Sequence, residues 1–222
     1  SHVSIVTMDE RMSVWVDAFL GVTDGKIAYI GKNAPEEKPE RILDGAGMVL
    51  MPGLVNCHTH LPMSLLRGYG EELPLSEWLS RSIFPQEERM DARSVKAAAL
   101  LSIAECLRFG VTSVSDMYFC SDAVAEAVAE SGIKANLCHA VTTDRTDDFD
   151  PDTDPDFREA EALHDKWHGY DGGRIRVDCG IHAEYTSTYP AWEALSKYAL
   201  ENGLGMQLHL SEMKQEQEDC EG

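Results

Sequence analysis

Basic residues are scarce in this sequence. It carries 19 lysines and arginines against 39 aspartates and glutamates, which gives a formal net charge of −20. A protein that binds nucleic acid needs a basic footprint to neutralise phosphates, so the composition argues against this class of partner. Anionic membrane surfaces are not favoured as partners either, and the charge indicates mainly a soluble protein.

Long apolar runs and paired cysteines are also missing. No run approaches the roughly 20 residues of a membrane span. The first ten residues show no basic region followed by an apolar core, so no signal peptide is visible. The six cysteines, at positions 57, 106, 120, 138, 179 and 220, form no C-x-x-C pair. We interpret them as reduced, buried thiols, which predicts a cytoplasmic protein.

Residues 1–51 show short strand patterns and no helical period. Turn residues separate the strands, and nothing in the segment suggests chemistry. It is predicted to be a small β unit with strands at Val3–Val6, Val14–Val22, Gly25–Gly31, Arg41–Asp44 and Met48–Met51.

From residue 53 onward, five strand patterns alternate with helix patterns. Alternation of this kind predicts βα units around a parallel sheet. No G-x-G-x-x-G follows the first strand, which argues against a dinucleotide-binding sheet. Helices are expected as short pieces within Leu73–Glu88 and at Ala92–Phe109, Ser121–Ser131 (capped near Ser121 or Asp122), Arg158–His168, Tyr189–Asn202 and from Lys214. After the first strand, which leads into His60, strands are expected at Val111–Met117, Ile133–Val141, Arg174–His182 and Gly205–Leu210, with an acidic loop at Asp144–Phe157.

Histidines gather where these strands end. His58 and His60 lie two apart after Leu54-Val55, so both imidazoles can point to the same face of a strand. An isolated H-x-H is more often two satisfied histidines than a metal site, but strand-end polar residues recur here, as the active site of a (β/α)₈ barrel requires. The other polar residues at the ends of the expected strands are Asp116, His139, His182 and His209. Asp116 has an equally good structural interpretation, as a hydrogen-bond partner of a neighbouring loop.

The fifth strand pattern adds a proton carrier. His209 ends it in G-M-Q-L-H-L-S-E, and Glu212 follows three residues later. A strand-end histidine with a glutamate just beyond it can place a metal ligand and an acid–base group in one pocket.

Two stretches resemble a known family. P-G-L-V-N-C-H-T-H-L resembles the first barrel strand of the amidohydrolase superfamily, and H-T-H-L-P-M-S-L-L-R-G-Y-G-E-E-L-P-L-S-E-W-L continues the likeness through Glu87. The resemblance is to the cytosine-deaminase-like and chlorohydrolase-like branch, and within it to 5-methylthioadenosine/S-adenosylhomocysteine deaminases. It implies an α/β fold: the N-terminal portion, about five βα units, of a metal-dependent (β/α)₈ TIM barrel over residues 52–222. Residues 1–51 would be the N-terminal part of a β-sandwich subdomain.

The same resemblance implies roles for individual residues. His58, His60 and His209 would bind one divalent metal ion, most simply zinc, with iron, manganese or nickel as alternatives. Glu212 would move protons and touch the base, while His182 and Glu87 would contact the substrate and Trp78 would line the pocket. The implied reaction is hydrolytic deamination of an adenosine-type nucleoside by metal-activated water, with release of ammonia. Another ring substrate (guanine, triazine or pterin type) is the alternative, and an inactive fragment is a third hypothesis.

The chain departs from the family pattern in two places. The family commonly has an arginine shortly after the third strand, whereas here His139 lies near that place and Arg145 further on. The sequence also stops at Gly222, before the family's sixth-strand histidine and its metal-binding eighth-strand aspartate. Residues 1–222 alone are therefore expected to be inactive and to need a homo-oligomer or a complementing C-terminal segment. Barrel residues such as Val111, Val114, Val177 and Ile181 are expected to be partly open to water.

Overall fold

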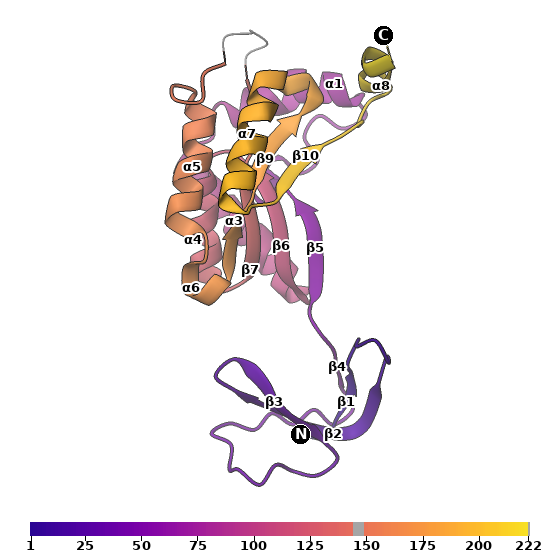
Figure 1. Ribbon diagram of the computed structural model, residues 1–222. Coiled ribbons are helices and arrows are strands. Elements are labelled where there is room, and N and C mark those ends of the chain that lie inside the picture. The colour runs from indigo at the N-terminus through magenta and orange to yellow at the C-terminus, as the bar shows by residue number, and fades with distance from the viewer. Residues whose placement is uncertain (144–148, 222) are drawn as a thin grey trace. The chain divides into compact units, whose positions relative to one another are not determined.

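The computed structural model describes residues 1–143 and 149–221 (Figure 1). The chain divides into two compact units, Ser1–Gly53 and Leu54–Gly222. Part of the expected acidic loop, including Arg145, lies outside the described residues.

The first unit is a four-stranded sheet in the order β3-β2-β1-β4. Val3, Ile5 and Ala18, which belong to its strands, form a small buried core. The prediction of a strand at Arg41–Asp44 is wrong. Ile42 and Leu43 are both 67% exposed, so the segment has no buried face. The Leu43 carbonyl accepts a hydrogen bond from the N-terminal amine. The strands are β1 Val3–Val6, β2 Val14–Thr23, β3 Lys26–Gly31 and β4 Val49–Leu50.

The second unit is built on parallel strands. β5, β6, β7 and β8 form one sheet in chain order, and β10 pairs with β9. Backbone hydrogen bonds from Val141 to Gly180 and from His182 to Val141 join β9 to the end of β7. The bounds are β5 Leu54–Thr59, β6 Val111–Tyr118, β7 Lys134–His139, β8 Ile175–Val177, β9 Cys179–Ala183 and β10 Met206–His209.

The single strand expected at Arg174–His182 is interrupted at Asp178, which separates β8 from β9. The Asp178 carboxylate accepts hydrogen bonds from the Asn136 side chain and from the Gly205 backbone. This residue therefore links the third strand to the segment before β10, and the fourth strand changes partner there.

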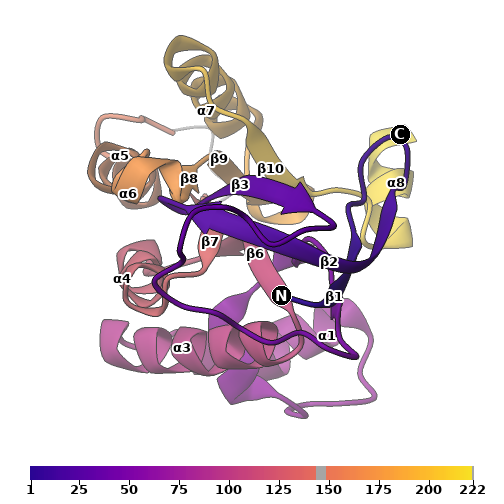
Figure 2. The same cartoon turned by 90° about the horizontal axis from the view of Figure 1, so that it is seen from below.

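Helices cover the outer side of these strands, and Figure 2 shows α3, α4, α5 and α7 following one another around it. None of the helices within the described ranges combines the length and apolarity needed to cross a membrane. The α-helices are α1 Leu75–Trp78, α2 Phe84–Glu87, α3 Ala92–Arg108, α4 Ser121–Ser131, α5 Pro155–Trp167, α6 Tyr170–Gly173, α7 Tyr189–Asn202 and α8 Lys214–Glu221; η1 Leu61–Leu66 and η3 Glu184–Thr186 are 3₁₀ and η2 Leu79–Ile83 is a π-helix.

Two helix starts differ from expectation. The N-cap of α4 is Cys120 in a left-handed conformation without a side-chain hydrogen bond, and Asp122 instead accepts hydrogen bonds from Lys166 and Trp167. Helix α5 begins three residues before the expected Arg158, because the Asp154 side chain caps it by accepting from the Phe157 backbone N–H. A side-chain oxygen in this position satisfies a helix N–H that would otherwise be unpaired.

The core lies between the strands and the outer helices. Val114 and Val177 pack in one cluster with residues of α3 and α4, and Ile181 packs in another with Leu195 of α7. The expectation that these three valine and isoleucine side chains are open to water is therefore wrong. Alternate residues of a strand point to opposite faces, and these point toward the helices.

Two alanine substitutions on α3, one at a buried and one at an exposed residue, should differ in their effect on the free energy of unfolding. Ile103 is 1% exposed within the main cluster, whereas Leu101 is 48% exposed on the same helix. Ile103→Ala should lower the free energy of unfolding by about 2–5 kcal/mol, because it removes buried methyl groups and leaves a cavity. Leu101→Ala should change it by less than about 1 kcal/mol. Urea unfolding of the protein that carries this chain measures both, and equal losses would contradict this packing.

Candidate metal centre and pocket

Three histidine side chains from opposite ends of the sequence meet in the second unit. One ring nitrogen from each of His58, His60 and His209 lies within 4.8 Å of the other two. The Nε2 atom of His209 is 3.1 Å from Nε2 of His58 and 3.2 Å from Nε2 of His60. At these separations, three potential ligand atoms could contact the same ion.

The spacing of these atoms fits a single divalent ion. Two imidazole nitrogens at about 2.0–2.1 Å from a tetrahedral ion would lie roughly 3.3 Å apart, close to the two observed separations. The Nδ1 atom of His60 is 2.6 Å from the Met117 carbonyl, so it is the protonated nitrogen and Nε2 keeps its lone pair. Burial, and secondarily the neighbouring His209, lowers the pKa of His58; burial likewise lowers that of His60. A neutral imidazole with an anchored second nitrogen, as at His60, suits a metal ligand.

Asp116 holds the turn that carries the histidine pair. Its Oδ1 accepts hydrogen bonds from the Thr59 hydroxyl, at 2.5 Å, and from the Leu61 backbone N–H, at 2.6 Å. Burial raises the pKa of Asp116 to about 7, against the effect of both hydrogen bonds. Of the two interpretations that the sequence left open, these contacts support the structural one.

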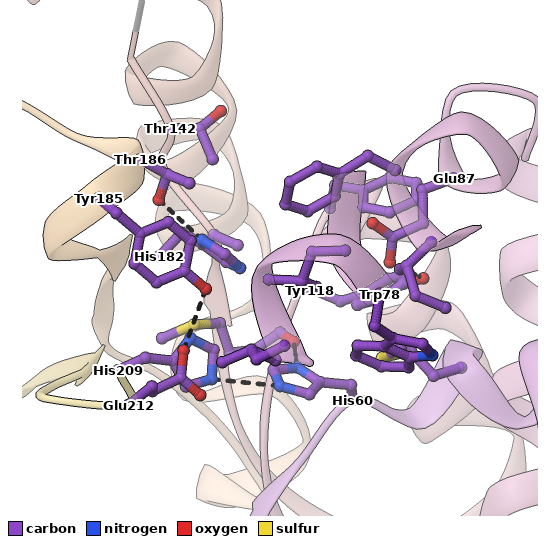
Figure 3. A pocket seen from close by; sticks show the side chains of 18 of the residues that line it. His60, Trp78, Glu87, Tyr118, Thr142, His182, Tyr185, Thr186, His209 and Glu212 are labelled. Atoms are coloured by element: carbon purple, nitrogen blue, oxygen red, sulfur yellow. Dashed lines mark hydrogen bonds between the residues drawn. The ribbon is translucent and has the colours of Figure 1, made fainter. Parts of the chain in front are cut away.

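The histidine cluster opens into a cavity of about 480 Å³ (Figure 3). Of the residues to which the family resemblance gave a role, all except His58 line this cavity. Those residues are His60, Trp78, Glu87, His182, His209 and Glu212.

Glu212 lies beyond β10 in a loop that is held on both sides. Its Oε2 accepts a hydrogen bond from the Tyr185 hydroxyl at 3.0 Å. Ser211 before it has a left-handed backbone, with φ of 54°, and its N–H donates to the Glu184 carboxylate. The loop conformation thus turns the Glu212 carboxylate into the cavity, beside the histidine cluster (Figure 3).

His182 is a neutral, oriented imidazole. Its Nδ1 lies 2.7 Å from the Thr186 hydroxyl, and its ring centroid is 5.1 Å from that of His209. Burial, followed by the nearby histidines His209 and His60, lowers the pKa of His182 to about 4. The side chain can therefore exchange hydrogen bonds with a ligand near neutral pH without carrying a charge.

Glu87 and Trp78 come from the short helices after the first strand. Glu87 is half-buried and accepts a hydrogen bond from the Tyr118 hydroxyl at 2.6 Å. Burial raises the pKa of Glu87, while the bond from Tyr118 lowers it. The Trp78 indole donates to the Tyr69 carbonyl at 2.9 Å, which fixes its ring as part of the cavity wall.

Sequence reasoning missed six polar residues of the cavity wall: Glu88, Tyr118, Thr142, Asp156, Tyr185 and Thr186. Tyr118 ends the second barrel strand, so its place on the strand was a usable signal. Asp156 was hidden in a run of alternating aspartates. His139 does not line the cavity; it is 2% exposed, next to Ser121.

The sequence model of the amidohydrolase family matches residues 49–222 of this chain. The chain belongs to this family. It is 35% identical over 218 residues to the 5-methylthioadenosine/S-adenosylhomocysteine deaminase of Thermoanaerobacter pseudethanolicus, covering 98% of this chain and 50% of the relative. It is 34% identical over 212 residues to the 5′-deoxyadenosine deaminase of Methanosarcina acetivorans, covering 96% and 48%. The chain thus spans about half the length of the curated relatives it matches.

Solved amidohydrolase structures share the fold. An adenosine deaminase from Xanthomonas campestris with bound zinc superposes with a TM-score of 0.78 at 28% identity, over 98% of this chain and 50% of that one. A zinc complex of atrazine chlorohydrolase from Arthrobacter aurescens TC1 gives 0.80 at 22% identity, over 93% and 51%, a likeness of fold alone. The predicted fold class, a portion of the amidohydrolase (β/α)₈ barrel, is confirmed.

Proposed function

We propose that the protein carrying this chain is a metal-dependent hydrolytic deaminase of adenosine-type nucleosides. The observation that carries the proposal is the convergence of three histidines at a cavity that also contains the Glu212 carboxylate. Relatives named as deaminases of 5-methylthioadenosine, S-adenosylhomocysteine and 5′-deoxyadenosine support the substrate class.

His58, His60 and His209 would hold one divalent ion, most simply zinc; iron, manganese and nickel accept the same ligands. When bound, such an ion would lower the pKa of a water molecule toward about 7 and so supply a nucleophile near neutral pH. The zinc-bound adenosine deaminase structure supports zinc as the first choice.

Glu212 is proposed as the proton carrier. A purine loses its amino group only if a ring nitrogen and the departing nitrogen each receive a proton. Glu212 shares the cavity with His60 and His209, and Tyr185 holds its Oε2, so the carboxylate is placed to accept a proton and to return it.

His182, Glu87 and Trp78 are proposed to bind the substrate. The uncharged His182 would hydrogen-bond to the base, and the Glu87 carboxylate would accept hydrogen bonds from sugar hydroxyls. The fixed Trp78 ring would supply apolar contact to the nucleoside.

A substrate panel tests the proposal. With zinc restored, the protein that carries this chain should release ammonia from adenosine, 5′-deoxyadenosine and 5-methylthioadenosine. Removal of the metal by a chelator should lower the rate at least about 100-fold, and one equivalent of zinc should restore it. Release from guanine, a triazine or a pterin alone would favour the alternative ring substrates. A protein that binds no stoichiometric metal would favour an inactive fragment.

The rest of the proposal concerns setting and assembly. The expectation of buried thiols is wrong for Cys57, which is exposed, and holds for Cys138 and Cys179 in the core. A cytoplasmic location accords with these free thiols. Assembly as a homo-oligomer, or with a segment that completes the barrel, also belongs to the proposal, and light scattering of the purified protein tests it.

A further inference from the structure

Carboxylates dominate the charged lining of the cavity. Glu87, Glu88, Asp156 and Glu212 all line it, and no lysine or arginine among residues 1–143 and 149–221 does so. Glu212 and Glu87 already have places in the proposed reaction. Asp156, the second residue of α5, has none.

Asp156 is held in one orientation by the segment after β7. Its Oδ2 accepts two hydrogen bonds from Thr142, from the backbone N–H at 2.9 Å and from the hydroxyl at 2.7 Å. Its side chain keeps 31% exposure. Because both hydrogen bonds reach the same oxygen, the carboxylate is fixed while Oδ1 is left for another partner.

His139 lies behind that second oxygen. Its Nε2 is 3.6 Å from Asp156 Oδ1, beyond ordinary hydrogen-bond length, and this buried atom has no hydrogen-bond partner among the described residues. The other ring nitrogen is 3.2 Å from the Ser121 hydroxyl. The carboxylate at the cavity wall is thus backed by a buried imidazole at ion-pair distance, which helps to hold its position together with the two hydrogen bonds from Thr142.

Asp156 is an anion near neutral pH. Burial favours the uncharged acid, but the contacts with His139 and Thr142 outweigh burial and lower the pKa of Asp156. A fixed negative charge in a partly enclosed cavity attracts cations and hydrogen-bond donors and repels anions more strongly than it would in water.

We propose that Asp156 selects the substituent at the 5′ position of the substrate: the cavity accepts nucleosides with a neutral or cationic 5′ group and rejects those with an anionic one. This inference rests on the proposed function, which puts the base at the histidine cluster. The sugar and its 5′ substituent must then occupy the remaining wall, where Glu87 and Asp156 present carboxylates. A phosphate or carboxylate there would meet like charge, whereas an ammonium group would find an acceptor.

Three adenosine derivatives of similar size test the proposal at constant ionic strength. They are 5′-deoxyadenosine (neutral), 5′-amino-5′-deoxyadenosine (cationic) and adenosine 5′-carboxylate (anionic). The zinc-loaded protein that carries this chain should show kcat/KM in the order cation, neutral, anion, with at least about tenfold between the first and the last. An anion that matches or exceeds the neutral compound would overturn the proposal.

Substitutions test whether Asp156 causes the preference for the charge of the 5′ group. Asp156→Asn keeps the size of the side chain and an oxygen for Thr142 but removes the charge, so the cation-to-anion ratio should fall about tenfold or more. Thr142→Val removes one of the two hydrogen bonds and should reduce the ratio less. Asp152→Asn, an equal charge change on an exposed residue that does not line the cavity, should leave the ratio as it is. An equal ratio in the wild-type and Asp156→Asn proteins, both folded by circular dichroism, would refute the assignment.

Direct binding separates this proposal from the proposed function. If none of the three compounds releases ammonia, the deaminase assignment fails, yet calorimetry with the same compounds still measures charge preference. Tighter binding of the cationic compound that is lost in Asp156→Asn would support the selection by itself. Binding that is independent of 5′ charge would overturn it.

Discussion

His209→Ala is expected to abolish stoichiometric metal binding and to reduce deamination at least about 1000-fold. Each of the three histidines supplies one of the few protein ligands of the proposed ion, and loss of a ligand costs more than the 10–100-fold typical of an outer-shell partner. His209 is also the member that closes the cluster, since its Nε2 lies within 3.2 Å of the Nε2 atoms of both other histidines.

Metal analysis of dialysed protein and an ammonia assay measure this effect together. His2→Ala is the matched control, because His2 is an exposed histidine of the first unit whose Nδ1 pairs with Asp17. The control should keep about one metal ion per chain. Full metal content and activity in His209→Ala would remove the basis for the metal centre, whereas loss of both in the His2 control would point to a general effect on folding.

Glu212→Gln is expected to separate metal binding from turnover. Glutamine has the size of glutamate and can still accept the hydrogen bond from Tyr185, but it cannot carry a proton between water and the purine ring. Positioned acid–base groups contribute about 10²–10⁴-fold to rate, so kcat should fall by this factor while metal content stays unchanged.

Glu218→Gln provides the control for that substitution. Glu218 is an exposed residue of α8 whose carboxylate pairs with Lys214, and it does not line the cavity. Its kcat should equal that of the unaltered protein. An unchanged kcat in Glu212→Gln would refute the assigned proton-carrier role, and a loss of metal in that variant would assign Glu212 to the metal centre instead.

Helix positions followed well from sequence because their signals are local. Asp91 caps α3 by accepting from the Ser94 backbone N–H, and Gly132 and Gly203 end α4 and α7 in left-handed conformations that glycine adopts without strain. The start of α5 was missed although its cap, Asp154, is local, whereas the break in the fourth strand depends on distant partners. Asp178 interrupts a strand because Asn136 and Gly205 hydrogen-bond to it.

The sequence by itself determined which chemistry this chain can attempt. The H-x-H pair, His209 and Glu212 could be singled out because strand-end position is a local property and because the surrounding residues resemble the amidohydrolase family, and the alternation of strands and helices predicted βα units. Their meeting is a tertiary event: His58 and His209 are 151 residues apart and approach because parallel strands align their C-terminal ends.

Only the tertiary structure decided the environment of the candidate site. Tyr118 of strand β6 reaches Glu87 of helix α2, Thr142 fixes Asp156, and burial lowers the pKa of His182 to about 4. Such contacts depend on side-chain geometry between elements and on exclusion of water, and neither is encoded in the spacing of residues along one strand or helix.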